Sequence, residues 1–165
     1  KTYVPVKLFV PLFGNNDAAV QITDTTVTID KDAESGDFTE IPNPLTEHED
    51  IASLERAIGF KLICPNLPDG YKADSFIDIS SELAEVNYTN GADTVCFRMK
   101  KGDEADISGD YNIYSVKKTL TAGDTAVTAE GDESISKATW TKSGFAFSLT
   151  SEKGLTDAAV IAAVK

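Results

Sequence analysis

The carboxylates between residues 102 and 112 have residue types and a spacing that could bind a metal ion. Asp103, Asp106 and Asp110 surround Ser108 and Gly109, and oxygen-rich loops of this kind suit Ca²⁺. The spacing is not the D-x-D-x-D-G pattern of a calcium loop, and no glutamate closes it at the twelfth position. We keep Asp103, Asp106 and Asp110 as metal-ligand candidates but favour a solvated loop. In that loop Asp106 and Asp110 would accept backbone N–H groups, and Gly109 would supply a left-handed turn.

The sequence offers few residues for acid–base or nucleophilic catalysis. His48 is the single histidine, so any Ser–His–Asp set or Cys–His pair would need it, and no G-x-S-x-G context accompanies it. It stands in TEHED, near an expected helix start, and we expect it to be exposed in an acidic patch. Carboxylate pairs could support glycosidase chemistry, yet among 27 acidic residues some pairs lie close by chance. We expect no enzyme and no cofactor, with a small acidic-residue hydrolase as an alternative.

The two cysteines lack a metal-binding spacing such as C-x-x-C. A disulfide between Cys64 and Cys96 would be possible outside the cell, but strand alternation argues against it. In an expected strand over residues 60–64, Cys64 shares the core side with Leu62. In the strand that holds Cys96, the core side belongs to Phe97. The two thiols would therefore point to opposite sides of one sheet and stay unpaired.

Aromatic side chains gather in the predicted strands and their loops. On a curved sheet they could line a groove for a lipid or a peptide, although we favour the interpretation that they form the core between sheet and helices. Tyr88, Tyr111 and Trp140 lie near loops and carry polar groups. They are the ligand-binding candidates, and a carrier of an apolar ligand in the concavity of the sheet is a second alternative function.

Charge and composition exclude several classes of protein. The chain has 15 basic and 27 acidic residues and a net charge of −12, so binding to nucleic acid or to an anionic membrane surface is disfavoured. Its 41% hydrophobic content is enough for a packed core. The apolar stretch Val4–Phe13 is too short and too interrupted by proline and lysine to span a membrane.

The chain divides by pattern near its first proline-rich breaker. Within residues 1–40, Val4–Phe13 and Ala19–Ile29 favour two strands or a β arm, which could pair with a sheet edge of this chain or of a second copy. The breaker Ile41–Pro44 then opens a single domain that we place at residues 41–165.

Two short helices frame that domain. Thr46 and Glu49 have the spacing of a capping box, and Gly59 supplies the C-terminal stop of the first helix. At the far end Thr156 is placed to cap a helix over Asp157–Val164.

Hairpins account for most of what lies between the helices. The strongest signal is Asn90-Gly91, between Leu83–Thr89 and Thr94–Met99. A two-residue loop there would set Val86 opposite Val95, which pairs apolar side chains with one another.

Two further hairpins follow. The first, across Gly123-Asp124, would set Leu120 opposite Val127, and the second would bring Trp140 close to Phe145. Strands and helices do not alternate, so a doubly wound parallel sheet is disfavoured. We expect an α+β fold, in which a curved antiparallel sheet of about six to eight strands carries the short first helix and a C-terminal helix packed on one face.

Five segments in this order resemble one bacterial family, catalogued as domain of unknown function 4367. The resemblance covers about residues 41–165 and is most specific in the loop that contains Gly-Asp-Tyr. The matching segments are Asn43-Pro44, Leu67–Tyr71, Tyr88–Gly91, Gly102–Tyr111 and Trp140–Phe147.

The resemblance implies a cellular setting rather than a reaction. Members are similar in being found mainly in Gram-positive bacteria and outside the cytoplasmic membrane, and no catalytic residues carry over. The chain begins at Lys1 without an initiator methionine, so we expect a trimmed chain without its targeting segment. The expected function is that of a non-enzymatic extracytoplasmic binding or sensing domain, extracellular or at the cell surface. Its partner would be a protein, a cell-wall component or an apolar ligand.

Overall fold

The computed structural model describes residues 20–22, 26–29 and 43–164. The chain forms two compact units, Lys1–Pro42 and Asn43–Lys165, and each is described by itself.

The first unit contains a small antiparallel pair. Strand β1 (Val20–Ile22) pairs with β2 (Val27–Ile29), so the segment Ala19–Ile29, which the sequence predicted as one β stretch, contains two strands. The other predicted strand, Val4–Phe13, lies outside the described residues.

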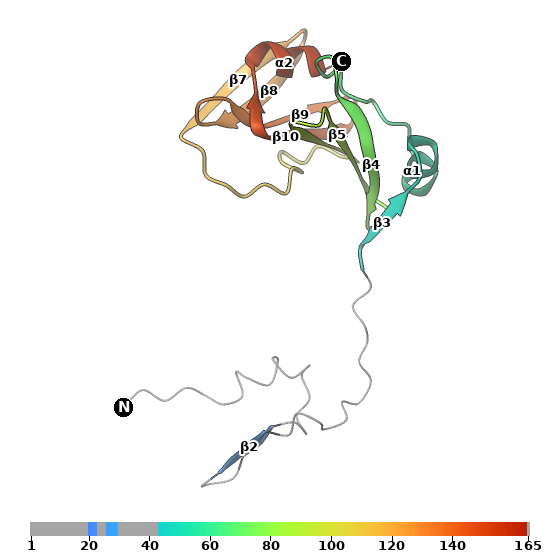
Figure 1. Cartoon of the computed structure of the whole chain (residues 1–165), viewed down its shortest axis with the longest axis vertical. Helices are drawn as coiled ribbons and strands as arrows, with labels where there is room; N and C mark the ends of the chain where they lie inside the picture. The colour runs from blue at the N-terminus through green and yellow to red at the C-terminus, as the bar shows by residue number, and fades with distance from the viewer. Residues whose placement is uncertain (1–19, 23–25, 30–42, 165) are drawn as a thin grey trace. The chain divides into compact units, whose positions relative to one another are not determined.

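The second unit is built on an open antiparallel sheet of eight strands, in the order β3-β4-β5-β6-β10-β9-β8-β7 (Figure 1). Two helices accompany it, so the predicted α+β class with an antiparallel sheet is confirmed. The strands are β3 (Leu45–His48), β4 (Lys72–Ile79), β5 (Leu83–Thr89), β6 (Thr94–Lys101), β7 (Val116–Ala122), β8 (Thr125–Gly131), β9 (Ile135–Lys142) and β10 (Phe145–Leu155), and the helices are α1 (Ile51–Ile58) and α2 (Asp157–Ala163).

The hairpin at Asn90 differs from its prediction in loop length. The side-chain Oδ1 of Asn90 accepts hydrogen bonds of 2.9 Å from the backbone N–H groups two and three residues later, and this turn closes a four-residue loop. Val86 therefore pairs with Phe97 instead of Val95. Because the shift is two residues, every side chain stays on its predicted face.

The other two hairpins set the aromatic packing. Leu120 lies opposite Val127 as predicted. Trp140 lies opposite Phe147, two residues beyond the predicted neighbour Phe145, because the turn has two residues, both with positive φ. The Trp140 and Phe147 rings stack with centroids 5.2 Å apart and planes 3° apart.

The start of α1 corrects the predicted capping box. Thr46 belongs to β3 and Glu49 follows that strand, so neither caps the helix. Asp50 is the N-cap: its carboxylate accepts from the Ser53 backbone N–H at 2.7 Å, and the Ser53 hydroxyl oxygen accepts from the Asp50 N–H at 3.2 Å. Gly59 ends the helix at φ 73°, as predicted.

Helix α2 follows its predicted start, since the Thr156 hydroxyl accepts from the Ala159 N–H at 3.2 Å. The predicted strand over residues 60–64 does not form, and this segment runs as irregular chain against the core. Among the helices of the described residues, none is long and apolar enough to cross a membrane.

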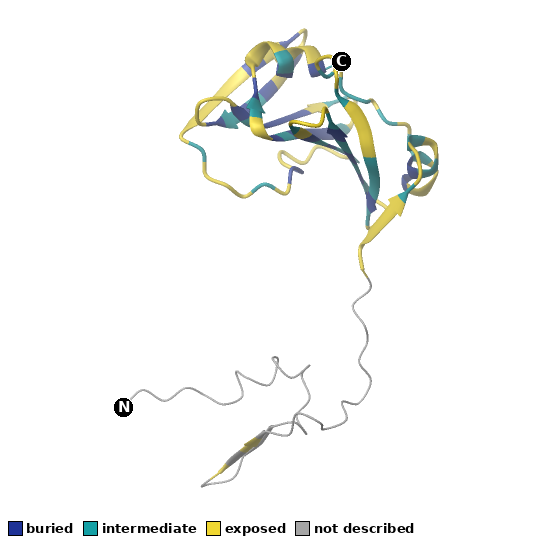
Figure 2. Cartoon of the chain, in the orientation of Figure 1, coloured by how far each residue is buried: buried dark blue, intermediate teal, exposed yellow. Residues whose placement is uncertain are grey.

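One face of the sheet carries the hydrophobic core, and both helices lie on it. Leu54 of α1 and Val160 of α2 are fully buried and belong to this core. Helix α1 contacts β3, β4 and β5, and α2 contacts β7. Buried residues alternate with more exposed ones along the sheet (Figure 2). The core includes Val86, Val95, Phe97, Met99, Leu120, Val127, Trp140, Phe147 and Leu149. The strands alternate in burial because consecutive side chains point to opposite faces.

The core predicts the cost of removing its largest fully buried side chain. Phe97→Ala should lower the free energy of unfolding by about 3–5 kcal/mol, because Phe97 is 0% exposed and its loss leaves a cavity. Thr119→Ala, on the exposed surface of β7, should change it by less than about 0.5 kcal/mol. Urea unfolding followed by the fluorescence of Trp140 measures both, and equal effects would contradict the assigned faces.

Candidate functional site: a polar groove on the sheet

The face of the sheet opposite the core is polar. Register places Arg98 of β6 between Glu85 of β5 and Ser148 of β10. Thr139 and Lys137 of β9 continue the same face. The segment between β6 and β7, residues 102–115, passes over these side chains, and we call it the covering loop.

Arg98 attaches the covering loop to the sheet. Its Nε donates to Glu85 Oε2 at 2.8 Å, and its Nη1 donates to the carbonyl oxygens of Ser108 at 2.7 Å and Ile107 at 3.3 Å. Gly109 has φ 68°, and a Cβ there would overlap the guanidinium group of Arg98. Glycine is therefore required at this position for two reasons: the backbone is left-handed, and Arg98 approaches too closely for a Cβ atom.

Lys137 makes a second attachment. Its Nζ lies 3.0 Å from Asp106 Oδ2 and 3.3 Å from Glu130 Oε2, and it donates to the Asp110 carbonyl oxygen at 3.4 Å. The Lys137 side chain is 7% exposed. Burial by itself would lower the pKa of Lys137, but the hydrogen bonds to Asp106 and Glu130 raise it. The ammonium group therefore stays charged and buried among its partners.

Side chains inside the covering loop hold its own backbone, as the solvated-loop interpretation predicted. Asp106 accepts from the Ser108 N–H at 2.8 Å and Asp110 from the Asn112 N–H at 2.9 Å. The Tyr114 hydroxyl donates to Asp110 at 2.6 Å. Burial opposes ionisation of both carboxyls, yet these hydrogen bonds bring the pKa of Asp106 and of Asp110 below the ordinary value.

The metal candidates are thus occupied by protein partners. Asp106 faces Lys137 and Asp110 faces Tyr114, whereas Asp103 is exposed. Within the described residues, no three acidic, histidine or cysteine side chains are grouped so that they could hold a metal ion.

A groove of about 830 Å³ runs between the covering loop and the polar face of the sheet. The strands of its floor, β5, β6 and β10, are interior strands of the sheet. The floor includes Asn87, Cys96 and Thr150, and the wall of the covering loop contributes Asp110, Asn112 and Tyr114.

The two thiols lie apart, as predicted, although Cys64 is in irregular chain and not in the strand on which that prediction rested. Both cysteines are unpaired. Cys96 lines the groove, while Cys64 lies beside the Tyr88 hydroxyl on the core side. Burial first, and then the Glu85 carboxylate, raises the pKa of Cys96 to about 12, so at neutral pH its thiol is protonated and a weak nucleophile.

The three aromatic candidates are not brought together. Tyr88 and Trp140 are buried in the core, at 9% and 6% exposure, on the side of the sheet away from the groove. Tyr111 is 94% exposed on the covering loop, and Ile113 is 98% exposed beside it. Asn87, next to Tyr88, and Asp110 and Asn112, on either side of Tyr111, line the groove.

His48 differs from its prediction. It lies in β3 opposite Phe76, on the core side of the sheet, and is not part of an exposed acidic patch. Its Nε2 is 3.6 Å from Asp78 Oδ2, with the two side chains 15% and 7% exposed. Pairing of β3 with β4 covers the imidazole, which a helix start at this position would have left in water.

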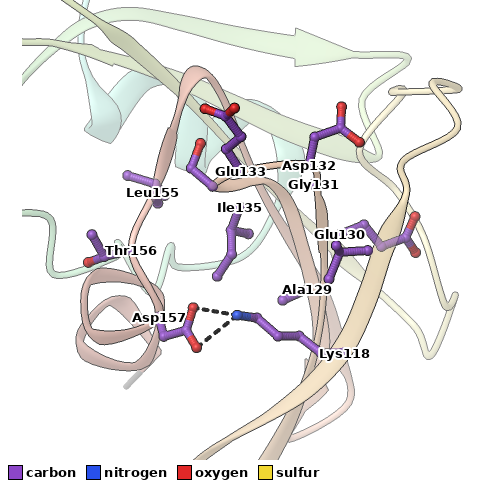
Figure 3. A pocket seen from close by; sticks show the side chains of 12 residues that line it. Lys118, Ala129, Glu130, Gly131, Asp132, Glu133, Ile135, Leu155, Thr156 and Asp157 are labelled. Carbon is purple, nitrogen blue, oxygen red and sulfur yellow. Dashed lines mark hydrogen bonds and ion pairs between the residues drawn. The ribbon is translucent and has the colours of Figure 1, made fainter.

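A second, smaller cavity of about 260 Å³ lies between the ends of β7–β9 and α2. Figure 3 shows Lys118 and Asp157 pointing toward one another across it, with Nζ 2.7 and 2.8 Å from the two carboxylate oxygens. Ile135 and Leu155 form part of its lining. Because Lys118 and Asp157 of this cavity already pair with each other, the larger groove remains the candidate site.

The sequence analysis did not identify Arg98, Lys137 or Asn87 as site residues. A signal for Arg98 was available, because strand pairing sets it directly opposite Glu85, a cross-strand ion pair of the kind that fixes neighbouring strands. Lys137 offered a similar signal, because Glu130 lies directly opposite it on β8. Its other partner, Asp106, is 31 residues away in an irregular loop and offered none.

Comparison with protein-family models, with curated proteins and with solved structures finds no match for this chain.

The carboxyls around Lys137 predict a dependence of stability on pH. The folded state lowers the pKa of Asp106 below its ordinary 3.8, so its stabilising contribution is present above pH 3.8 and is lost as the pH falls through the lowered value. Asp106→Asn should therefore be less stable than the wild type at pH 7, and the difference should shrink as the pH falls below about 4.

Urea unfolding between neutral and strongly acidic pH measures this difference. Asp103→Asn, in the same loop but exposed, is the control and should follow the wild type throughout. A constant gap between Asp106→Asn and the wild type at every pH would mean that ionisation of Asp106 does not stabilise the fold.

Proposed function

We propose that this chain is a non-enzymatic binding or sensing domain that recognises its ligand in the polar groove beneath the covering loop. The observation that carries the proposal is the arrangement of the groove. It is large enough for a ligand, its wall is fastened to the sheet by Arg98 and Lys137, and its floor presents polar side chains. Ligand sites in proteins are typically pre-formed concavities with a few fixed polar groups.

The chemistry of the groove favours binding over catalysis. Of its carboxylates, Glu85 is engaged by Arg98 and Asp110 by Tyr114 and Asn112. The pKa of Asp110 is lowered, which is the opposite of what a general acid needs at neutral pH. His48 is on the core side of the sheet. These features make an acidic-residue hydrolase the weaker alternative.

A carrier of an apolar ligand is also less well supported. The aromatic side chains that would line an apolar cavity pack on one another, as in the stack of Trp140 on Phe147 and the tilted contact of Phe97 with Phe147. The two cavities described above both have charged and hydroxyl-bearing linings.

The proposed location, outside the cytoplasmic membrane of a Gram-positive bacterium, rests on the sequence resemblance. A domain in that position would meet the cell wall and proteins of the cell surface first. A polar groove suits a hydrophilic component of that environment better than a lipid.

Filling the groove should abolish binding. Thr150→Tyr places a bulky side chain on the groove floor, whereas Thr119→Tyr makes the same change outside the groove, on the exposed surface of β7. We expect isolated cell-wall fragments of a Gram-positive bacterium to retain the wild type and Thr119→Tyr equally. Retention of Thr150→Tyr should fall about tenfold or more.

Co-sedimentation measures retention, and circular dichroism checks that both variants are folded. Equal retention of the two folded variants, or no retention of the wild type, would contradict the proposal.

A further inference from the structure

We infer that the polar groove takes a neutral, hydroxyl-rich ligand, that is, a saccharide. This inference rests on the proposed function and names the class of ligand. It follows from three properties of the groove: its arginine and its inner carboxylates already have partners, its open polar groups are neutral amide oxygens and hydroxyls, and the interior strands of its floor offer little free backbone.

The inner charged side chains of the groove already have protein partners. Arg98 pairs with Glu85 at 2.8 Å, and Asp110 is held by Tyr114 and Asn112. Glu152 lies at the exposed rim. An anionic ligand would thus meet no uncommitted cation in the described groove, and a cationic ligand would have to compete with existing partners for the inner carboxylates.

The polar atoms that remain open belong to neutral side chains: they are amide oxygens, which accept, and hydroxyls such as that of Thr94, which donate or accept. Asn87 donates both amide hydrogens, to Ser75 and Glu85, and Asn112 donates to Asp110. The amide oxygens of Asn87 and Asn112 accept no hydrogen bond within the described residues. The Thr150 hydroxyl has the Cys96 thiol beside it, which is a weak partner. Such a lining favours a ligand that brings many neutral donors, and hydroxyl groups are those donors.

The backbone of the groove floor is not available to a ligand. Strands β5, β6 and β10 are interior strands of the sheet, so along the floor as far as Thr150 their N–H and C=O groups are committed to neighbouring strands. The pairing of β10 with β9 is interrupted only beyond Thr150, at the rim of the groove. An extended peptide usually gains affinity by adding to a free sheet edge, and this floor has none. Recognition must run through side chains, which suits the hydroxyl-bearing rim of a sugar ring.

Titration of the ¹⁵N-labelled chain with short oligosaccharides tests the inference. The probes are neutral oligomers of hexose and of N-acetylhexosamine, an oligogalacturonate as the anionic counterpart, and peptides of lysine and of glycine and serine. We expect neutral saccharides to shift the amide signals of groove residues such as Asn87 and Thr150, with affinity that changes less than about twofold between low and high salt.

A matched pair of variants places the binding in the groove. Thr150→Val keeps the shape of the side chain and removes its hydroxyl, and it should weaken saccharide binding about tenfold. Thr119→Val makes the same change outside the groove and should leave affinity unchanged within about twofold.

Each outcome decides one of the two claims. Binding of peptides or of the anionic oligomer at the groove, without neutral saccharides, would overturn the saccharide inference and leave the binding domain standing. Shifts confined to residues outside the groove, or no shift with any probe, would overturn the saccharide inference. Loss of retention of Thr150→Tyr on cell-wall fragments would then still support the groove as a binding site.

Discussion

The guanidinium group of Arg98 is the interaction on which the polar side of the molecule depends. It is a charge on the face of an eight-stranded sheet, and such a group must be paired and fully hydrogen-bonded to be tolerated. Glu85 supplies the charge, and the carbonyl oxygens of Ser108 and Ile107 supply further acceptors. Those carbonyls belong to the covering loop. Because this partly buried cation needs partners, it holds an irregular loop against the sheet, and the loop forms the wall of the groove.

The two faces of the sheet have separate tasks. The core face is covered mainly by aromatic and aliphatic side chains and by both helices, so it stabilises the fold. The polar face carries Arg98 and Lys137, whose partners come from the neighbouring strands and from the covering loop. Alternation along each strand keeps these tasks apart, because neighbouring residues such as Phe97 and Arg98 point in opposite directions.

Local signals predicted the framework well, and long-range pairing explains what they missed. The α+β class, the Leu120–Val127 register and the Thr156 cap follow from alternation, turn residues and capping. Loop length at Asn90 was misjudged because its side chain can close a longer turn. His48 was placed at a helix start because its segment mixes strand and helix signals, and only pairing with β4 decides between them.

The site was harder to predict than the fold. The acidic residues of the covering loop suggested a metal ion. The positive charge that lies beside Asp106 is instead the ammonium group of Lys137. Tyr88 and Trp140 were chosen for their polar groups, and burial in the core removes them from any surface. The sequence shows which side chains are able to pair. Which of them meet depends on the path of the covering loop, which has no regular secondary structure.

Hydrogen exchange at the covering loop tests most directly whether its wall is fixed before any ligand binds. The amides of Ser108, Asp110 and Asn112 each donate to a side chain within that loop. We expect them to exchange at least about tenfold more slowly than an unstructured chain of the same sequence. Exchange of all three at the unstructured rate would mean that Arg98 and Lys137 do not hold the loop, and that the groove is not a pre-formed site.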